Sequence, residues 1–273
     1  MIYGKNVKIN RQSGTTFYQL GGTILDAKYD PRPTVNQEVG SDTGRTLAAD
    51  KVVSVKPQLE FTMNVRRLVD YLTTYCMITA NGAVPAHDMI VTDGSETFKL
   101  FSCKADKIRI TINQTDPIKA VVTVLALSYG TAATGTFLFR TEAPMYKDAV
   151  GLLTLDGTVV NWKEIEISCD NNVLQEILGS TITPAAVEEQ HALFEITITR
   201  AKPATSLIGA AYNGTAQTLV IELNDHQTSP VEKILTFTDC FISTSQLEDH
   251  ELGIVYEKIT VKAKTYTLTD APP

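Results

Sequence analysis

The densest cluster of residues able to do chemistry is Glu248-Asp249-His250-Glu251. Carboxylate oxygens and an imidazole are ligands that a divalent cation accepts. Consecutive residues of a strand point to opposite faces, however, so these side chains cannot converge in an extended segment. We interpret the cluster as a solvated acidic turn and predict no metal site there.

Glu164 and Glu166 are the best candidates for acid–base chemistry, because they share one face of a predicted strand. Such catalysis needs carboxylates that converge across a cleft, and one strand supplies only one side of it. The histidines show no metal-ligand spacing. The sequence also lacks a phosphate-binding loop, a dinucleotide fingerprint, a zinc-protease motif and a nucleophile elbow. We therefore predict no catalytic residue, no metal, no cofactor and no enzymatic activity.

The four cysteines, Cys76, Cys103, Cys169 and Cys240, lie far apart and form no C-x-x-C pair. This spacing argues against a zinc knuckle or a thiol redox site. We expect all four to be buried and reduced.

Composition narrows the class of protein further. The chain has 273 residues, of which 43% are hydrophobic and 20% are charged, and its formal net charge is −7. It contains no apolar run near the roughly 20 residues of a membrane helix, and its start resembles no secretory signal. An acidic balance gives no overall electrostatic footprint for holding nucleic acid. We expect a protein made in the cytoplasm that binds neither membranes nor DNA.

An internal repeat organises the chain. Thr123–Tyr129 aligns with Thr260–Tyr266 at an offset of 137, and Cys103 aligns with Cys240 at the same offset. Further matches, at offsets of 135 to 138, join Glu60–Met63 to Glu195–Ile198, Val35–Glu38 to Val173–Glu176, and Ala48-Ala49 to Ala185-Ala186. Matches in one order at nearly one spacing indicate a tandem duplication. We predict two domains, 1–136 and 137–273.

Each predicted domain is mainly β. Apolar and polar residues alternate over 59–65, 164–167 and 195–199, as in half-buried strands. One apolar stripe at helical spacing lies within Arg67–Cys76, and a weaker counterpart within Thr205–Tyr212. The fold class we predict is two tandem β-sandwich or barrel domains, each with a short flanking helix on its outside.

Two long polar stretches, Asp30–Asp50 and Asp170–Gln190, interrupt the strands at equivalent points of the repeat. A loop of about 20 residues is uncommon in a compact domain unless it has a function, such as reaching a neighbouring subunit. The charge also divides unevenly, because residues 1–136 carry 15 Lys+Arg and 12 Asp+Glu whereas residues 137–273 carry 9 and 19. Unlike halves from different chains would then attract each other in a ring.

The order of segments resembles a known family over most of residues 45–267. Phe98-Lys-Leu-Phe101-Ser-Cys-Lys-Ala-Asp-Lys-Ile-Arg-Ile110 followed by Val121–Val124 is similar to a stretch of the tail tube proteins, or major tail proteins, of long-tailed viruses of bacteria and archaea. Ser102 stands where that family often has glycine. The resemblance continues through Ala143-Pro144, Leu155–Gly157, Glu164–Asn172, Phe194–Ile198, Leu219–Leu223 and a last strand to Tyr266.

This resemblance implies a structural virion protein whose rings stack into the hollow tail tube, with an acidic lumen through which viral DNA passes during ejection. Single-domain members form hexameric rings, and members with two tandem domains form trimers with pseudo-sixfold symmetry. The resemblance leaves open trimer or hexamer, and a contractile or a non-contractile tail. It implies as partners further copies of the chain, a tape-measure protein and tail-initiation or terminator proteins.

Within this reading, the candidate functional residues belong to interfaces. Lumen candidates are the acidic residues Glu60, Glu164, Glu166 and Glu195, for which an outer solvent-facing position is the alternative. Candidates for contacts between stacked rings are Pro31, Gln37, Gly40, Asp50, Asn172, Gln175, Gly179 and Gln190.

An alternative function is a tandem β-sandwich module that binds a carbohydrate or a protein. Such modules expose aromatic platforms, whereas only 7% of the residues are aromatic and the single Trp162 lies beside a predicted hairpin. A protein that stays monomeric would favour this alternative.

Overall fold

A computed structural model describes residues 2–4, 7–30, 33–39, 47–68, 71–77, 83–131, 135–178, 183–190, 192–201, 214–224, 233–249 and 255–270. The chain is mainly β, as predicted. Its first half contains β1 (Ile2–Gly4), β2 (Lys8–Ser13), β3 (Thr16–Tyr18), β4 (Gly22–Asp30), β5 (Pro33–Val39), β6 (Leu47–Val55), β7 (Gln58–Val65), η1 (Leu72–Cys76), β8 (His87–Thr92), β9 (Thr97–Asn113), β10 (Lys119–Leu125) and β11 (Ser128–Thr131). Its second half contains η2 (Lys147–Ala149), β12 (Val150–Leu155), β13 (Thr158–Val159), β14 (Glu164–Asp170), β15 (Leu174–Glu176), β16 (Ala186–Glu188), β17 (Leu193–Ala201), β18 (Gln217–Leu223), β19 (Lys233–Asp249), β20 (Val255–Ala263) and β21 (Thr265–Asp270).

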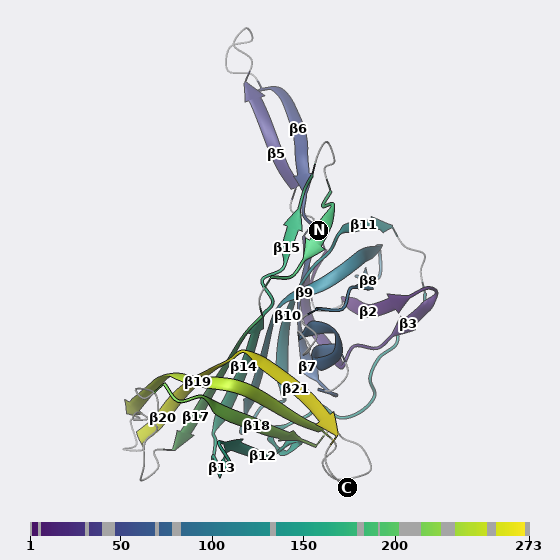
Figure 1. Cartoon of the computed structure of the whole chain (residues 1–273). Helices are drawn as coiled ribbons and strands as arrows, with labels where there is room; N and C mark the ends of the chain where they lie inside the picture. The colour runs from purple at the N-terminus through teal and green to yellow at the C-terminus, as the bar shows by residue number, and fades with distance from the viewer. Residues whose placement is uncertain are drawn as a thin grey trace.

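Eight strands form one continuous antiparallel sheet, which we call the main sheet. Their order is β4-β7-β10-β9-β14-β17-β20-β19. The joint between the halves is the β9–β14 ladder, which pairs seven residues on each side from Lys107↔Asp170 to Asn113↔Glu164. The two halves therefore share a sheet rather than only touching (Figure 1).

Two long strands leave the main sheet and carry a side sheet each. The first part of β9 pairs with β8 and β11, and β8 continues to β2 and β3. The first part of β19 pairs with β18 and β21, and β18 continues to β12 and β13. Each long strand passes through a residue with positive φ, Ser102 at 47° and Asp239 at 50°. Glycine adopts this left-handed conformation without strain, whereas serine and aspartate adopt it less readily.

The same pairing scheme thus occurs in both halves, residue for residue in places. Lys107↔Thr123 in the β9–β10 ladder has its counterpart in Thr244↔Thr260 of the β19–β20 ladder, at an offset of 137. Leu59 pairs with Val124, and Ile196 with Val261, at that offset too. By strand pairing, the residue equivalent to Ile196 is therefore Leu59 and not Phe61. For this strand the structural offset between the halves is 137, two residues more than the offset of 135 read from the sequence.

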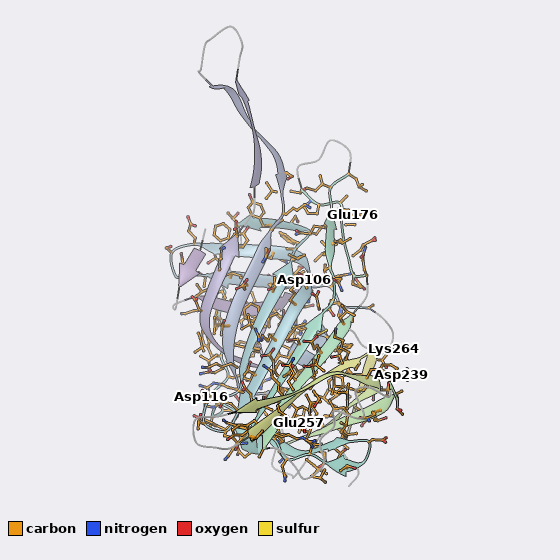
Figure 2. All side chains as sticks on the ribbon, turned by 90° about the vertical axis from the view of Figure 1, so that its left-hand side faces the viewer. Asp106, Asp116, Glu176, Asp239, Glu257 and Lys264 are labelled. Carbon is orange, nitrogen blue, oxygen red and sulfur yellow. The ribbon has the colours of Figure 1, made fainter. Side chains whose placement is uncertain are left out.

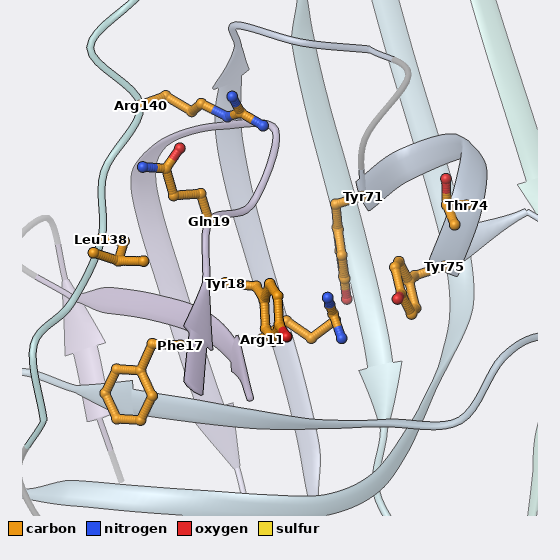
Figure 3. A pocket seen from close by; sticks show the side chains of 9 residues that line it. All are labelled: Arg11, Phe17, Tyr18, Gln19, Tyr71, Thr74, Tyr75, Leu138 and Arg140. Carbon is orange, nitrogen blue, oxygen red and sulfur yellow. The ribbon is translucent and has the colours of Figure 1, made fainter. Parts of the chain in front are cut away.

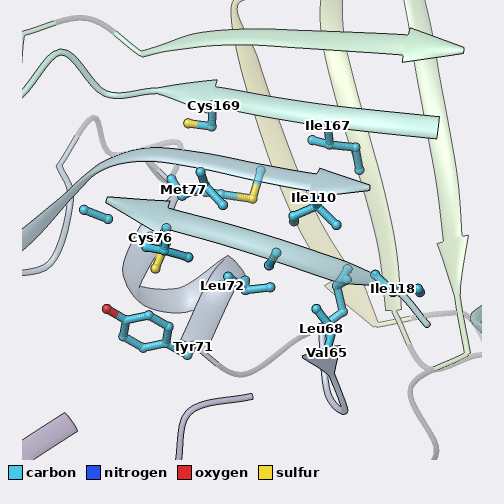
Figure 4. Close-up of a cluster of buried hydrophobic side chains, with 14 of the residues drawn as sticks. Val65, Leu68, Tyr71, Leu72, Cys76, Met77, Ile110, Ile118, Ile167 and Cys169 are labelled. Carbon is cyan, nitrogen blue, oxygen red and sulfur yellow. The ribbon is translucent and has the colours of Figure 1, made fainter. Parts of the chain in front are cut away.

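A single apolar cluster fills the space behind the main sheet (Figure 4). The helix predicted over Arg67–Cys76 is only the one-turn π-helix η1, and it lies inside the fold rather than on its outside, with Leu72 and Cys76 fully buried. The amide of Asn171 donates to the Cys76 carbonyl at 2.7 Å, and the Tyr266 hydroxyl donates to the Thr73 carbonyl at 2.8 Å. Side chains of the second half thus donate hydrogen bonds to backbone carbonyls of η1. The counterpart predicted within 205–212 lies outside the described residues.

The four cysteines are free and buried, as predicted. Burial raises the pKa of the Cys76 and Cys103 thiols well above their ordinary value. Such thiols stay protonated and unreactive at neutral pH.

One buried ion pair joins β17 to β20. The guanidinium of Arg200 donates to Glu257 Oε2 at 2.9 and 2.7 Å, and the Ser245 hydroxyl donates to Oε1 of the same carboxylate at 2.7 Å. Glu257 is fully buried. Removing one partner of such a pair leaves an uncompensated charge in the interior.

We therefore expect Glu257→Leu to lower the free energy of unfolding by roughly 3–5 kcal/mol. Adding Arg200→Met removes the orphaned charge and should recover most of that loss. Urea unfolding of both variants measures this, and a double variant as unstable as the single one would contradict it.

The helices of the described residues include none long and apolar enough to cross a membrane.

Candidate functional site

The main sheet presents one face to the core and the other to the outside. Along β14 the buried Ile165 and Ile167 alternate with Glu164 and Glu166, and the other main-sheet strands alternate in step. We call the outer side the polar face; Figure 2 shows the side chains of the broad sheet. All four predicted glutamates, Glu60, Glu164, Glu166 and Glu195, lie on it. The four glutamates therefore share one surface of the main sheet.

Three of those glutamates line a shallow hollow of about 370 Å³ together with Arg109 and Lys258, while Thr197, Thr199 and Thr260 form its floor. Arg109 Nη2 lies 2.6 Å from Glu166 Oε2. This hydrogen bond, and then the charge of the carboxylate, raise the pKa of Arg109, so the guanidinium is a permanent cation. The hollow therefore gathers three carboxylates and two cations from β9, β14, β17 and β20 around the Arg109–Glu166 ion pair.

Basic residues missed by the sequence reasoning share the polar face. Lys107 pairs with Asp170 at 3.3 Å, and Lys262 lies 3.9 Å from Glu195. Among the side chains that the structure describes, the face carries the acidic Asp26, Asp30, Glu60, Glu164, Glu166, Asp170 and Glu195 and the basic Lys28, Lys107, Arg109, Lys119, Lys258 and Lys262. The face is thus nearly charge-balanced, rather than uniformly acidic as the resemblance implies for a lumen.

The predicted stacking loops contain hairpins instead of loops. Over Asp30–Asp50 the chain forms β5, which pairs with β6, and over Asp170–Gln190 it forms β15, which pairs with β16. The β5–β6 hairpin projects away from the body as an arm, while β15 stays beside the body (Figures 1 and 2). The sequences of these strands show no strict alternation of apolar and polar residues, so the alternation rule does not detect them.

The stacking candidates fall in different environments. Gln37 and Asp50 pair directly across the arm. Gln175 is tied to the body, since its amide donates to the carbonyls of Pro57 at 3.0 Å and Ala126 at 2.8 Å. Asn172 occupies a turn with φ 48°, and Gln190 is exposed. Pro31, Gly40 and Gly179 lie outside the described residues.

Glu248 and Asp249 continue β19 as strand residues, so the acidic turn predicted from the 248–251 cluster is wrong for them. His250 and Glu251 lie outside the described residues. Among the residues that the structure describes, no three His, Cys, Asp or Glu side chains gather to hold a metal ion.

The two ends of the main sheet are strand edges. The second part of β19, from Phe241 onward, pairs with β20 on one side and with no described strand on the other. At the opposite end, β1 pairs with Ala27–Tyr29 of β4, and the preceding residues of β4 have no described partner on that side. Leu247, on β19, is 44% exposed. An unpaired edge with exposed apolar side chains is a surface for pairing with another chain.

A pocket that no sequence pattern indicated lies over the first side sheet (Figure 3). Its volume is about 380 Å³, and the Arg11 guanidinium lies between the rings of Tyr18 at 4.1 Å and Tyr75 at 4.3 Å. Behind it, His87 Nδ1 lies 3.1 Å from the Pro85 carbonyl, to which it must donate, so Nε2 accepts from the Tyr71 hydroxyl at 2.9 Å. The wall of the pocket thus consists of aromatic rings packed around the guanidinium of Arg11.

Desolvation by burial lowers the pKa of His87 from 6.5 to about 4. Between pH 6.5 and 4 the imidazole is therefore protonated in the unfolded chain but not in the folded one. The free energy of unfolding falls by roughly 3 kcal/mol as the pH drops from 6.5 to 4. We expect His87→Gln to flatten this part of the pH profile. Urea unfolding between pH 7.5 and 4 measures it, and an equally steep loss in the variant would contradict the assignment to His87.

An antiparallel main sheet with one polar face, two side sheets and a projecting hairpin defines a mainly β protein. The sequence profile of the phage tail tube protein family matches residues 14–253, and the chain belongs to this family. The structure of the cap that terminates the tube of the anti-feeding prophage is similar over 48% of this chain and 95% of its own, at 15% identity and a TM-score of 0.36. Hcp1 from Flavobacterium johnsoniae is similar over 45% of this chain and 98% of its own, at 15% identity and a TM-score of 0.31. No curated protein matches the chain.

Proposed function

We propose that this chain is the structural subunit that assembles into stacked rings and forms the hollow tail tube, through which viral DNA passes during ejection. The observation that carries the proposal is the pair of strands that end the main sheet, β19 with no described strand on its outer side from Phe241 onward and β4 covered by β1 at Ala27–Tyr29 alone among its described residues. Strands alternate in direction from β4 to β19, so β19 of one copy meets β4 of the next in antiparallel orientation. Lateral joining would remove both edges.

The two halves, 1–136 and 137–273, are proposed as two copies of one tail tube domain. The support is the recurrence of the pairing scheme, in which β4, β7, β10 and β9 correspond to β14, β17, β20 and β19. The joint inside the chain, β9 to β14, would then be repeated between chains as β19 to β4.

This correspondence gives a register for the joint between chains. Arg109 pairs with Ser168 and Ile110 with Ile167 inside the chain. Shifting β9 by 137 residues and β14 by 138, as the ladders require, places Gln246 opposite the neighbour's Asp30 and Leu247 opposite its Tyr29.

Three copies of the eight-stranded main sheet would close a barrel. At roughly 4.8 Å per strand its circumference is about 115 Å, a backbone diameter of about 37 Å that strand tilt widens further. A duplex of DNA fits through such a lumen after side chains are placed. Trimeric rings with pseudo-sixfold symmetry are therefore the assembly we favour over hexamers.

The polar face would line the lumen, because core residues cover the other face. Its cations are engaged by carboxylates in pairs such as Lys107–Asp170 and Arg109–Glu166. A passing phosphate would have to displace a carboxylate from each of these paired cations, which weakens its contact with the face. We infer a non-binding conduit from balanced charge rather than from excess negative charge.

The β5–β6 arm, with Gln37 and Asp50, is the element we propose for contacts between stacked rings, joined by the β15–β16 region. Partners of the ring would be further copies, a tape-measure protein and tail-initiation or terminator proteins. The proposed location is the tail of the virion, after assembly in the host cytoplasm, and no catalytic step is assigned to the chain.

Electron microscopy of the purified protein at high concentration tests this function. Rings or tubes with an open lumen and three chains per ring are the expected result. Monomers that stay dispersed even with tail-initiation proteins added would instead favour the tandem β-sandwich binding module.

A further inference from the structure

The first strand of the chain lies on the edge that the proposed assembly needs. β1 runs antiparallel to β4 and pairs Ile2 with Tyr29, Tyr3 with Lys28 and Gly4 with Ala27. On its other side β4 pairs with β7. β1 is therefore the ninth strand in this row, added at its outer edge.

The corresponding edge in the second half is already occupied by a main-sheet strand. The ladders make Ala27 equivalent to Ile165 and Tyr29 equivalent to Ile167, because each pair meets equivalent residues of β7 and β17. On β14, Ile165 pairs with Ile112 of β9 and Ile167 with Ile110. β1 thus takes on β4 the place that β9 takes on β14, in the same antiparallel direction.

The same equivalence names the strand that β1 excludes. Ile110 and Ile112 correspond to Leu247 and Asp249 of β19, so a neighbour's Leu247–Asp249 would pair with the backbone of Ala27–Tyr29. One side of a strand can pair with only one other strand. Resting on the proposed function, we propose that β1 is an internal cap that mimics the neighbour's β19 and must leave β4 before a ring closes.

The lengths of the two ladders fit a removable cap. β1 contributes three paired residues, whereas the β9–β14 joint that serves as the model of the interface pairs seven. Exchange of the short strand for the long one gains backbone hydrogen bonds, but only after the cap has opened. The free subunit thereby keeps its edge covered against pairing with the wrong chain, and opening of β1 limits the rate at which rings begin.

A reversible lock tests the cap. Tyr3 and Lys28 are directly opposite, and both types of antiparallel pair have Cα separations that a disulfide accepts. In Tyr3→Cys/Lys28→Cys, oxidation should hold β1 on β4 and lower the yield of rings at least tenfold. Reduction should restore it, and the two single-cysteine variants should assemble under both conditions.

A second variant acts in the opposite direction. Deletion of residues 1–6 from the otherwise full chain should shorten the lag before light scattering rises, or lower the concentration at which rings appear by about tenfold. An oxidised double-cysteine protein that assembles like its reduced form, or a deletion that leaves the lag unchanged, would overturn the cap while leaving the tube proposal standing. Absence of rings from wild-type and reduced protein alike would overturn the tube proposal and the cap with it.

Discussion

Leu247→Asp is expected to abolish ring formation while leaving the subunit folded. Leu247 is 44% exposed in the single chain, so a carboxylate there stays solvated, although its cross-strand neighbour Glu257 makes the substitution mildly destabilising. At the proposed joint it lies opposite Tyr29, where its counterpart Ile110 is 1% exposed. Burying an unpaired carboxylate at each joint costs at least about 3 kcal/mol, which raises the concentration needed for assembly by more than roughly 100-fold.

Val159→Asp is the matched control, because Val159 is an apolar residue of similar exposure, 57%, on β13 and away from both edges. Sedimentation and electron microscopy should show rings for this control and monomers for the Leu247 variant. Both variants should keep a cooperative thermal transition, which shows that the subunits are folded. Normal rings from Leu247→Asp would exclude the β19 edge as the joint.

Replacement of Glu60, Glu164, Glu166 and Glu195 by glutamine is expected to turn the tube from a conduit that releases DNA into one that retains it. The polar face then loses four negative charges while its cations remain, and Arg109 loses its partner at 2.6 Å. Arg109 and Lys262 are the cations that lose a carboxylate partner. If each then contacts a phosphate, the affinity of the variant tube for DNA should fall by roughly 12-fold between 50 and 200 mM salt. Tubes should still form, since none of the four side chains lies in the proposed joint.

Binding of linear duplex DNA to purified tubes over a salt series measures this effect. A matched set of carboxylates away from the polar face consists of Glu96, Glu142, Asp148 and Glu222, and their amide variants should bind no more DNA than wild type. If the two quadruple variants bind DNA equally, overall charge rather than the polar face controls retention. Failure of the first variant to form tubes would show that these glutamates are structural contacts.

The alternation of apolar and polar residues was sufficient to predict the β class and to bring four glutamates to one face. It could not reveal the cations on that face, because Lys107 meets Asp170, and Arg109 meets Glu166, only through the pairing of β9 with β14 across the two halves. The arm escaped prediction because residues 33–39 carry no period that packing on a core would impose. The helix predicted over Arg67–Cys76 is shortened to η1, whose carbonyls accept hydrogen bonds from Asn171 and Tyr266, more than ninety residues away.

Repeat offsets read from the sequence also differ locally from the ladders. Residues of like type, Glu60 and Glu195, align at an offset of 135, whereas pairing with β10 and β20 makes Gln58 the equivalent of Glu195. A shift of two residues along a strand keeps a side chain on the same face, so glutamates on the polar face can match in type without being equivalent in register. Register depends on backbone pairing and needs the structure.

Asp30→Cys/Gln246→Cys tests the central claim most directly. The proposed register places these two positions opposite each other on neighbouring copies, and the four native cysteines are buried. Their counterparts inside the chain, Arg109 and Ser168, are paired. The control Arg109→Cys/Ser168→Cys should therefore form its disulfide within one chain and give no covalent dimer or trimer. Oxidised rings of the Asp30→Cys/Gln246→Cys variant, run on a denaturing gel without reductant, should give covalent dimers and trimers and nothing larger. Uncross-linked monomers from intact rings would contradict a joint between β19 and β4.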